Sequence, residues 1–485
     1  MLSKFQRIIS KLVLICVGIF TTVVFVQMGG FFTLNYLKPE PVLAILVFLC
    51  AIIFVAGVGY LLYRIRDDDK NLNRLILLSM LFIFFVVAII WLKVVPQTQI
   101  SDFGEFWNSA PRALAGDKIF SYDNDYFAKW AYQTGFLVYV MTVVKIFGQH
   151  VIAIQLLNVI YQVLILYLAY LISLQIFNKV KVARLTVFLL MIDLDWFALN
   201  SQSDNQYIGM LLFLLTFYLI MQNKYWTYAL AGLTLAVGSI VRPIGPVIIA
   251  GIVVYGLLYV FIANNKFSWS GLGKIVMTLV IYQVIFSGAS LAIKSSGLNS
   301  YGLTNRDSEW KFVVGLDAYS AGSYDQKMVD RFDLQESRAK MSKKEHKIIR
   351  ENINNLNATH GWLRLFWAKN RTLWAGRSMA IDFTEFGKIH SLRMDNLVKL
   401  LGYMGSVILI IFSWIGSLSL FKRKIDNKVF LILLPLMAYA VVQLLIEVQG
   451  RYRLEFLPVI AVLAGIGLYS CFDWIKSRRE KKLDV

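Results

Sequence analysis

The stretch that decides the fold runs from Val42 to Arg64 and reads VLAILVFLCAIIFVAGVGYLLYR. It carries no charged residue before Arg64. A helix that crosses the hydrocarbon core of a membrane needs about 20 consecutive, mostly apolar residues. This stretch meets that requirement and is typical of a transmembrane helix.

Similar apolar runs recur along the chain. They lie near 8–28, 42–64, 75–95, 151–177, 183–199, 206–222, 226–241, 244–263, 273–293, 396–420, 428–446 and 454–474. Of the 485 residues, 58% are hydrophobic and 16% charged, whereas soluble domains carry about 25% charged residues. This composition excludes a water-soluble globular protein, a disordered chain and a coiled coil. We predict an all-α, polytopic bundle of about 12 transmembrane helices.

The charges suggest how the bundle is oriented. The chain has 49 Lys and Arg against 30 Asp and Glu, and cytoplasmic loops of membrane proteins are enriched in Lys and Arg. The run 135–147 is too short to span a bilayer. If it does not cross, the basic clusters at 64–74, 422–428 (with Lys424) and 476–482 share one side with both termini. We therefore expect cytoplasmic termini, a retained first helix rather than a cleaved signal peptide, and an interfacial or re-entrant 135–147 segment.

This topology leaves two large extracytoplasmic segments, 96–150 and 294–395. The second holds 17 Lys and Arg against 12 Asp and Glu, with an amphipathic stretch at 336–356 and an aromatic one at 361–374. We expect it to form a small helical region outside the membrane. The predicted division is 1–74 for two leading helices, 75–293 for a transmembrane core, 294–395 for the large loop and 396–485 for the C-terminal helices and basic tail.

Acidic residues occur at two places on the predicted outer side. The first outer loop contains TQISDFGEFWN at 98–108. If a helix begins there with Ser101 as its N-cap, Asp102 and Glu105 share one face. A short turn between two helices holds Asp204. The alternative for Asp102 and Glu105 is that they are helix-capping acids in a solvated loop.

Asp193 and Asp195 fall in the last turns of the predicted 183–199 helix. Ionisable residues at membrane depth face a cavity or a partner. The alternative is an interfacial pair that points outward to water.

Arginines occur at two further outer turns. Arg242 and Pro243 end one helix, and Glu447, Gln449, Arg451, Tyr452 and Arg453 lie before the last helix. Arginine at the membrane boundary suits a phosphate at headgroup level. The alternative is a solvated boundary charge, which Arg453 fits better than Arg242.

The order of these elements resembles the GT-C superfamily of glycosyltransferases that use polyprenyl-phosphate sugars. The nearest branch resembles bacterial relatives of protein O-mannosyltransferases and lipid A aminoarabinose transferases. The resemblance rests on Ser101-Asp102-Phe103, the amphipathic segment 104–148, Asp204, Arg242-Pro243 and the element from Glu447 to Pro458, over most of 75–474. Two features depart from it. The helices within 8–64 precede the usual first helix, and Gln133-Thr134-Gly135 stands where a Pro-Pro pair is often found.

The chemistry of such a transfer can be matched to residues. A sugar on a lipid phosphate has a good leaving group, so the reaction needs a base near the acceptor hydroxyl and cations on the departing phosphate. Asp102 is the predicted base, and Trp107, Tyr126 and Trp130 are candidates for stacking on sugars. The full set of predicted residues is Asp102, Glu105 and Asp204 for catalysis, and Lys129, Arg242, Glu447, Gln449, Arg451 and Tyr452 for substrate binding. The assignment of Lys129 as a contact to the donor phosphate is implied by the resemblance.

The predicted partners are a polyprenyl-phosphate sugar, an acceptor that is a glycolipid, a wall polymer or a protein, and the bilayer, with no role for nucleic acid. Inverting and retaining transfer are both compatible with the sequence. So are a metal-independent reaction and one that uses Mg²⁺ or Mn²⁺ held by Asp102, Glu105 and Asp204. The three cysteines lie inside apolar runs, and the four histidines form no HExxH motif, which argues against a zinc enzyme.

Three other classes of protein share some of these features. A lipid-linked-sugar flippase or transporter is also polytopic, but such proteins commonly carry charges deep inside several helices. A polysaccharide polymerase or ligase shares the donor and the large outer loop. A purely structural membrane protein does not explain acids and arginines gathered in outer turns.

Overall fold

The structure, a computed structural model, describes residues 2–120, 126–263, 266–304, 309–332, 336–423 and 425–483. Lys424 of the second basic cluster lies outside these residues. The described chain is helical throughout, apart from a two-residue antiparallel pair of strands, β1 (Ile262–Ala263) and β2 (Lys266–Phe267). The prediction of an all-α fold is confirmed.

The first half of the chain alternates long helices with shorter ones. Its α-helices are α1 (Leu2–Phe32), α2 (Pro41–Arg64), α3 (Lys70–Val94), α4 (Ser101–Leu114), α5 (Tyr126–Lys129), α6 (Thr134–Phe147), α7 (Val151–Phe177), α8 (Val180–Met191), α9 (Leu194–Phe197), α10 (Gln206–Met221) and α11 (Tyr225–Val241). A π-helical turn, Thr33–Leu37, extends α1, and 3-10 turns lie at Ala131–Gln133 and Ala198–Ser201.

The second half contains the large loop and the last helices. Its α-helices are α12 (Gly245–Tyr255), α13 (Trp269–Ser295), α14 (Trp310–Gly315), α15 (Gln326–Val329), α16 (Arg338–Ala358), α17 (Trp362–Asn370), α18 (Phe386–Ile389), α19 (Leu392–Leu420), α20 (Val429–Val442) and α21 (Leu457–Leu483). Gly256–Phe261 and Arg371–Ala375 are π-helical, whereas Asp382–Thr384 and Gly450–Phe456 are 3-10 segments.

Local sequence explains where several long helices begin. Pro41 occupies the first turn of α2, where a missing N–H costs nothing. The Asp69 carboxylate caps α3 by accepting a hydrogen bond from Leu72 N at 2.9 Å. The Ser268 hydroxyl caps α13 in the same way, accepting from Gly271 N at 3.0 Å. These caps satisfy N–H groups that no helical carbonyl can reach.

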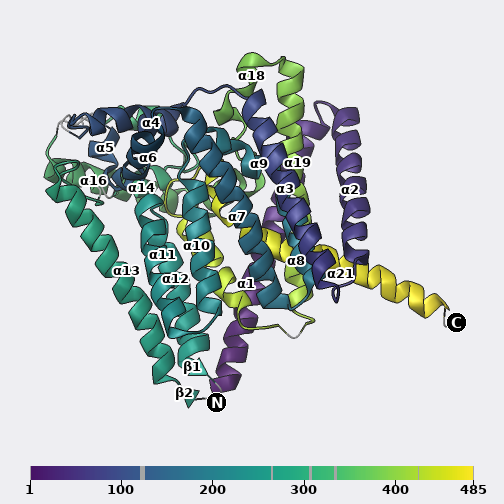
Figure 1. Cartoon of the computed structure of the whole chain (residues 1–485). Coiled ribbons are helices and arrows are strands. Elements are labelled where there is room, and N and C mark those ends of the chain that lie inside the picture. The colour runs from purple at the N-terminus through teal and green to yellow at the C-terminus, as the bar shows by residue number, and fades with distance from the viewer. Residues whose placement is uncertain are drawn as a thin grey trace.

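The long helices stand side by side, and the connecting segments gather at the two ends of the bundle (Figure 1). Helices α4, α5, α6, α14 and α16 lie together at the upper end in that view, whereas both termini lie toward the lower end. Because α3 ends and α7 begins at the upper end, α6 does not carry the chain across the bundle.

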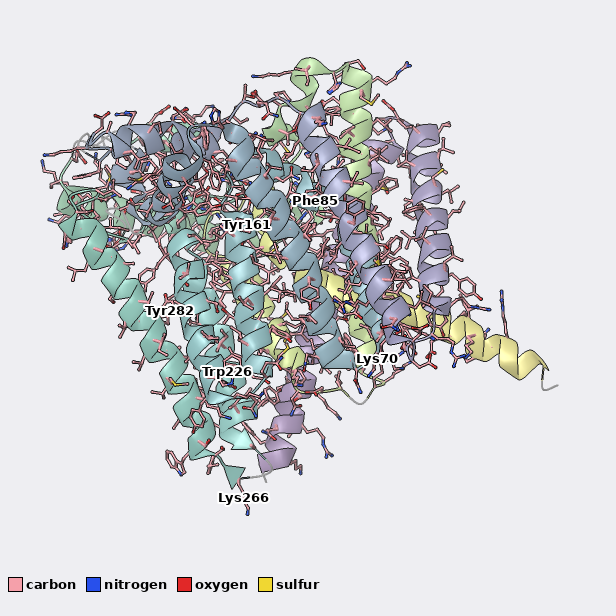
Figure 2. The ribbon with its side chains drawn as sticks, in the orientation of Figure 1. Lys70, Phe85, Tyr161, Trp226, Lys266 and Tyr282 are labelled. Atoms are coloured by element: carbon pink, nitrogen blue, oxygen red, sulfur yellow. The ribbon has the colours of Figure 1, made fainter. Side chains whose placement is uncertain are left out.

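The described helices suit a multi-pass membrane protein. Seven are long and apolar enough to cross a membrane, and five further apolar helices are shorter. Figure 2 shows Lys70 and Lys266 at the lower end, whereas Phe85, Tyr161 and Tyr282 lie along the middle of the helices. Such a distribution, with apolar and aromatic side chains between charged ends, is the one that a bilayer requires.

Small residues allow a close contact between helices α19 and α21. A side chain on Gly416 of α19 would meet the Leu463 carbonyl of α21, and one on Gly467 would meet the Phe412 carbonyl. Glycine therefore lets the two backbones touch, as is common where membrane helices pack. The contact fixes the start of α21, which carries the arginines of the preceding 3-10 segment.

The predicted helix 183–199 is interrupted. Helix α8 ends at Met191, and the extended backbone of Asp193 separates it from α9. Asp193 and Asp195 are both buried. Asp195 Oδ2 lies 3.3 Å from Arg453 Nη2, so Asp195 faces a partner, and the alternative of a pair that points outward to water is wrong.

Arg453 is also not a solvated boundary charge. Only 1% of its surface is exposed. It donates hydrogen bonds to the carbonyls of Trp374 at 3.1 Å and Gly376 at 2.5 Å. A buried arginine needs partners of this kind, and the interruption of the helix places Asp195 where it can provide one.

Candidate functional site

Two loops that are about a hundred residues apart in sequence are joined by hydrogen bonds at the upper end of the bundle. Gln99 Nε2 donates to Ser201 O at 2.9 Å, and Gln202 Nε2 donates to Thr98 O at 3.0 Å. Ser203 Oγ donates to Phe103 O at 2.5 Å. These bonds fix the backbone on both sides of Asp102 before α4 begins its second turn.

Helix α4 presents its two acids differently. It begins at Ser101, whose φ is +52°, and the capping position is Ile100, which provides no side-chain hydrogen bond. The expectation that Ser101 is the N-cap is therefore wrong by one residue. The side chain of Asp102 is 35% exposed and lines a cavity. Glu105 is exposed and does not line it.

This cavity, here called the Asp102 cavity, has a volume of about 410 Å³. It lies between α4, the start of α12, α13, α14, the end of α20 and the 3-10 segment Gly450–Phe456. Its polar and charged lining consists of Asp102, Gln133, Asn205, Ser239, Arg242, Lys311, Gln443, Glu447 and Arg451. Its apolar and aromatic lining consists of Phe103, Phe106, Tyr132, Pro243, Ile244, Pro246, Tyr282, Phe286, Leu303, Tyr439, Ile446 and Tyr452.

Five of the predicted site residues thus line one cavity: Asp102, Arg242, Glu447, Arg451 and Tyr452. They come from three separate parts of the chain. The structure brings them together, while their chemical roles stay predictions.

A continuous chain of side chains runs along the polar wall. Arg451 Nη2 donates to Asp102 Oδ2 at 2.5 Å, and Arg451 Nε donates to Gln449 Oε1 at 3.0 Å. Gln449 Nε2 then donates to Glu447 Oε1 at 2.8 Å, and Lys311 Nζ donates to Glu447 Oε2 at 2.6 Å. Gln449 is therefore a link in this chain although it does not line the cavity. Charge-assisted bonds of this kind hold both cations at fixed positions.

Arg242 is held by a second polar group. Its Nη1 donates to Asn205 Oδ1 at 2.9 Å, and its Nε donates to Glu455 Oε1 at 2.5 Å. Glu455 also accepts from Gln206 Nε2 at 3.1 Å. Burial lowers the pKa of Arg242, but Glu455 opposes this effect and the net pKa is raised. Arg242 is therefore a permanent cation on the cavity wall.

Asp204 lies behind the cavity rather than in it. Its side chain is almost fully buried, and Oδ1 accepts the Gln206 N–H at 3.1 Å. Oδ2 is buried with no hydrogen-bond partner among the described residues. Burial raises the pKa of this carboxyl to about 7, although Arg242 opposes the shift. Asp204 is placed to influence Arg242, and it does not line the space where a substrate fits.

Lys129 and the predicted stacking aromatics lie beside the cavity. Lys129 Nζ lies 4.1 Å from the centre of the Trp310 ring and 5.2 Å from that of Trp130. Trp107 is buried in the small apolar core that α4 shares with α6. Among the lining residues of the Asp102 cavity, Phe103, Tyr132 and Tyr452 provide the aromatic faces instead.

The three predicted acids do not form a metal-binding set. Asp102 is paired with Arg451, Glu105 is exposed and Asp204 is buried behind the cavity. Within the described residues, no three His, Cys, Asp or Glu side chains are grouped so that they could hold a metal ion. The donor set does not fit the Mg²⁺ or Mn²⁺ site considered from the sequence.

Sequence reasoning missed Lys311, Glu455 and Asn205. Asn205 is next to Asp204, and Glu455 lies within the element from Glu447 to Pro458, so proximity could have indicated both. Lys311 is one of 17 basic residues in 294–395, and no local pattern distinguishes it. Only the fold shows that it meets Glu447.

Comparisons with known proteins found similarity among solved structures alone. No family model matches the chain, and no curated protein matches it. Among solved structures, it is similar to the archaeal oligosaccharyltransferase AglB from Archaeoglobus fulgidus, determined in complex with an inhibitory peptide and a dolichol-phosphate. The two chains are 14% identical with a TM-score of 0.45, over 84% of this chain and 52% of that one. The chain thus spans about half the length of that protein.

Proposed function

We propose that the protein is a membrane glycosyltransferase of the GT-C type. In this proposal it transfers a sugar from a polyprenyl phosphate to an acceptor at the extracytoplasmic face. The observation that carries the proposal is the Asp102 cavity, in which a half-exposed carboxylate and three cations, Arg242, Lys311 and Arg451, line the same space. The order of sequence elements described above points to the same class of enzyme.

The walls of the cavity suit a donor that is half lipid and half sugar phosphate. Tyr282 and Phe286 belong to α13, a helix long and apolar enough to cross a membrane, and Pro246 begins α12 beside them. An isoprenoid chain can lie against this apolar wall. The phosphate then lies at the membrane boundary, near Arg242 and Arg451, which line the same cavity.

The reaction assigns a separate task to each group. Asp102 accepts the proton of an acceptor hydroxyl, and the resulting oxygen attacks the anomeric carbon of the sugar. The bond between that carbon and the phosphate oxygen breaks, and the electron pair leaves with the polyprenyl phosphate. Arg242 and Arg451 stabilise the charge that develops on this leaving group. No second carboxylate is needed as an acid, because phosphate is a good leaving group.

The contact between Asp102 and Arg451 brings the two proposed roles together. Arg451 donates to Asp102 at 2.5 Å, so the base and one cation for the phosphate are neighbours on the cavity wall. A donor phosphate competes with Asp102 for this guanidinium.

Purified protein in liposomes tests the proposal. The liposomes contain polyprenyl phosphate carrying a labelled sugar, together with a lipid extract as a source of acceptors. Formation of a labelled product with an equal amount of free polyprenyl phosphate supports the proposal. Movement of intact donor between leaflets, with no bond broken, would identify a flippase and contradict it.

A further inference from the structure

A second cavity lies between the two leading helices and the rest of the bundle. Its volume is about 770 Å³. Phe31, Leu34, Asn35 and Tyr36 come from the end of α1 and its π-helical extension, and Pro39, Glu40, Leu43 and Ala44 from the start of α2. The remaining lining consists of Arg371, Thr372, Gly376, Arg377, Met379, Asn396, Lys399, Leu400 and Gly450. We call it the leading-helix cavity.

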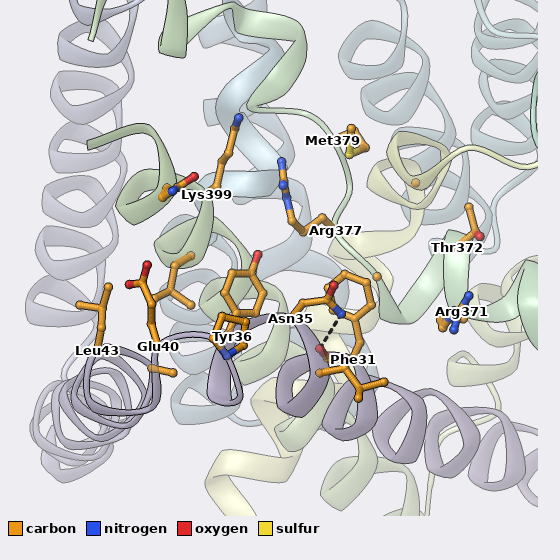
Figure 3. Close-up of a pocket in the computed structure, with 17 residues that line it drawn as sticks. Phe31, Asn35, Tyr36, Glu40, Leu43, Arg371, Thr372, Arg377, Met379 and Lys399 are labelled. Carbon is orange, nitrogen blue, oxygen red and sulfur yellow. Dashed lines mark hydrogen bonds between the residues drawn. The ribbon is translucent and has the colours of Figure 1, made fainter. Parts of the chain in front are cut away.

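The charged lining of this cavity favours an anion. It contains three cations, Arg371, Arg377 and Lys399, against the single acid Glu40. Figure 3 shows Lys399 and Arg377 next to each other, with Arg371 farther along, beyond Phe31. The cationic charge therefore extends along the cavity rather than occupying one point.

Two of these cations are held in place from behind. Arg377 pairs with Asp382, and Lys399 Nζ lies 3.0 Å from Asp382 Oδ1 and 2.6 Å from Asp395 Oδ2. Neither Asp382 nor Asp395 lines the cavity. A site whose cations are already ordered loses less side-chain entropy when a ligand binds.

Two other groups lack partners. Arg371 is exposed and makes no ion pair or side-chain hydrogen bond among the described residues. The hydroxyl oxygen of Tyr36 is buried without a hydrogen-bond partner in the same part of the chain. Buried hydroxyls are normally paired. Acceptor oxygens on a ligand in this cavity, such as those of a phosphate group, would give these groups partners.

A third cavity, of about 420 Å³, lies beside both this region and the candidate active site. It shares Thr372, Met379 and Gly450 with the leading-helix cavity, and it shares Arg451 with the Asp102 cavity. The leading-helix cavity is therefore separated from Arg451 by one intervening cavity.

The surroundings favour a lipid over a soluble anion. Both leading helices are long and apolar enough to cross a membrane. Leu34, which lines the cavity, is 58% exposed, and Val42 at the start of α2 is 79% exposed. In a membrane, the acyl chains of lipids would cover these apolar side chains.

We infer that the leading-helix cavity binds the phosphate-bearing headgroup of a membrane lipid, and that this lipid carries the acceptor hydroxyl. The role as acceptor rests on the proposed glycosyl transfer, whereas binding of the headgroup does not. The inference selects an anionic lipid among the three acceptor classes that the sequence leaves open.

Native mass spectrometry of the full-length protein tests the binding. The protein is released from nanodiscs of phosphatidylcholine that contain a minority of phosphatidic acid, and the lipids that stay bound are identified. We expect retention of phosphatidic acid over phosphatidylcholine. Arg371→Glu should weaken this retention about tenfold or more, as reversal of a charge-assisted contact does, and Tyr36→Phe should weaken it less. Arg364→Glu is the matched control, because Arg364 is exposed on α17 and does not line the cavity.

Two results would overturn the binding. One is equal retention of phosphatidic acid by wild type and Arg371→Glu. The other is displacement of the lipid by inorganic phosphate at the concentration at which phosphatidic acid itself competes, because the site would then recognise free phosphate rather than a lipid.

A second measurement, of sugar transfer, distinguishes a failure of the proposed function from a failure of lipid binding. Asp102→Asn should retain phosphatidic acid normally while sugar transfer is lost. If phosphatidic acid binds through Arg371 and wild type transfers no sugar, the proposed function fails and the lipid site stands. If wild type transfers sugar and Arg371→Glu does so to the same lipid acceptors at the same rate, the acceptor role is wrong.

Discussion

Asp102 and Arg451 show how single residues define the candidate chemistry. The carboxylate is half-exposed and faces the cavity, while the guanidinium is almost fully buried and bonded to it. Arg451 also lies 5.0 Å from the Phe103 ring centre and 4.7 Å from that of Phe383. These aromatic faces stabilise the cation.

Arg242 is expected to act on the donor. Truncating a charge-assisted contact in a partly buried site costs about 2–5 kcal/mol, so Arg242→Ala should raise the KM for donor strongly and leave the KM for acceptor nearly unchanged. Arg242→Lys should recover only part of the loss, because lysine lacks the planar fork. Steady-state kinetics with each substrate varied in turn measures this.

The Arg242→Ala change also leaves Glu455 buried without its partner. The double variant Arg242→Ala/Glu455→Gln also removes the unpaired charge of Glu455. If the double variant binds donor as well as wild type does, Arg242 serves only to neutralise Glu455. We expect it to remain as defective in donor use as Arg242→Ala.

The raised pKa of Asp204 predicts a specific pH dependence of the stability of the fold. Its pKa is raised from 3.8 to about 7 by burial. Below pH 3.8 the carboxyl is neutral in both the folded and the unfolded protein, so burial carries no electrostatic cost. As the pH rises to 7 and above, the unfolded state gains an ionised, hydrated carboxylate that the folded state disfavours. Asp204 thus destabilises the fold progressively across this range.

Asp204→Asn should remove this cost. Thermal unfolding in detergent should show no more than a small gain near pH 4, and a gain on the order of a few kcal/mol above pH 7. Asp117→Asn is the control, because Asp117 is exposed. A gain for Asp204→Asn that is the same at both pH values would contradict the account.

At the scale of elements, hydrophobic pattern predicted most of the helices. The bounds of α2, α7, α10 and α11 lie within one residue of the predicted runs. A long apolar stretch in a bilayer forms a helix because its backbone groups must bond to one another. The prediction failed at the end of α8, where the buried Asp195 pairs with Arg453, a residue far along the chain. Contacts between distant segments are not readable from local periodicity.

Some of the predicted site residues line the cavity and others do not, because local sequence does not show how distant segments pack. Asp102, Arg242 and Arg451 stand at turns beside apolar runs, where a charge is conspicuous. Glu105 and Lys129 stand in the same outer loop but lie outside the cavity, because helix phase and local packing decide which side chains face it. The assignment of residues 1–74 as an addition to a conserved core also stays a prediction.

The large loop contributes to the cavity through α14 rather than through its aromatic stretch. Leu303 and Lys311 line the Asp102 cavity. In contrast, α17 contacts the first membrane helix and the segment that follows α20: the Gln27 amide donates to Trp367 O at 2.9 Å, and Lys369 Nζ donates to Ile446 O at 2.8 Å. We therefore expect α14, rather than the aromatic stretch, to help in selecting the acceptor.

Lys311→Ala tests this role. It removes one of three cations from the cavity and leaves Glu447 without its ion pair, so we expect slower transfer and weaker discrimination among acceptors. Lys327→Ala is the control, because Lys327 is exposed on α15 of the same loop. Rates and acceptor preferences of both variants are compared with wild type. Unchanged preference in Lys311→Ala would leave α14 with a packing role only.

At the scale of the whole molecule, the account requires the cavity and both termini to face opposite sides of the membrane. The turn after α4 and the turn between α10 and α11 lie at opposite ends of the bundle (Figure 1). Lys118 and Lys224 are exposed at these two turns. The positive-inside bias predicts that Lys118 faces the outside and Lys224 the cytoplasm.

Cysteine labelling of intact cells measures this orientation. Lys118→Cys and Lys224→Cys are made in a background in which Cys16, Cys50 and Cys471 are replaced by serine. A membrane-impermeant thiol reagent should modify position 118 in intact cells and position 224 only after the cells are opened. Modification of position 224 in intact cells would reverse the topology and place the Asp102 cavity on the cytoplasmic side.

The most direct test of the central claim compares Asp102→Asn with Glu105→Gln in turnover of a polyprenyl-phosphate sugar by purified protein. The two acids lie on the same helix, but only Asp102 lines the cavity. A positioned base contributes about 10²–10⁴-fold to the rate. We therefore predict that Asp102→Asn loses transfer by at least this factor while still binding donor, and that Glu105→Gln stays within a few-fold of wild type. Transfer by Asp102→Asn at a rate close to that of wild type would contradict the account.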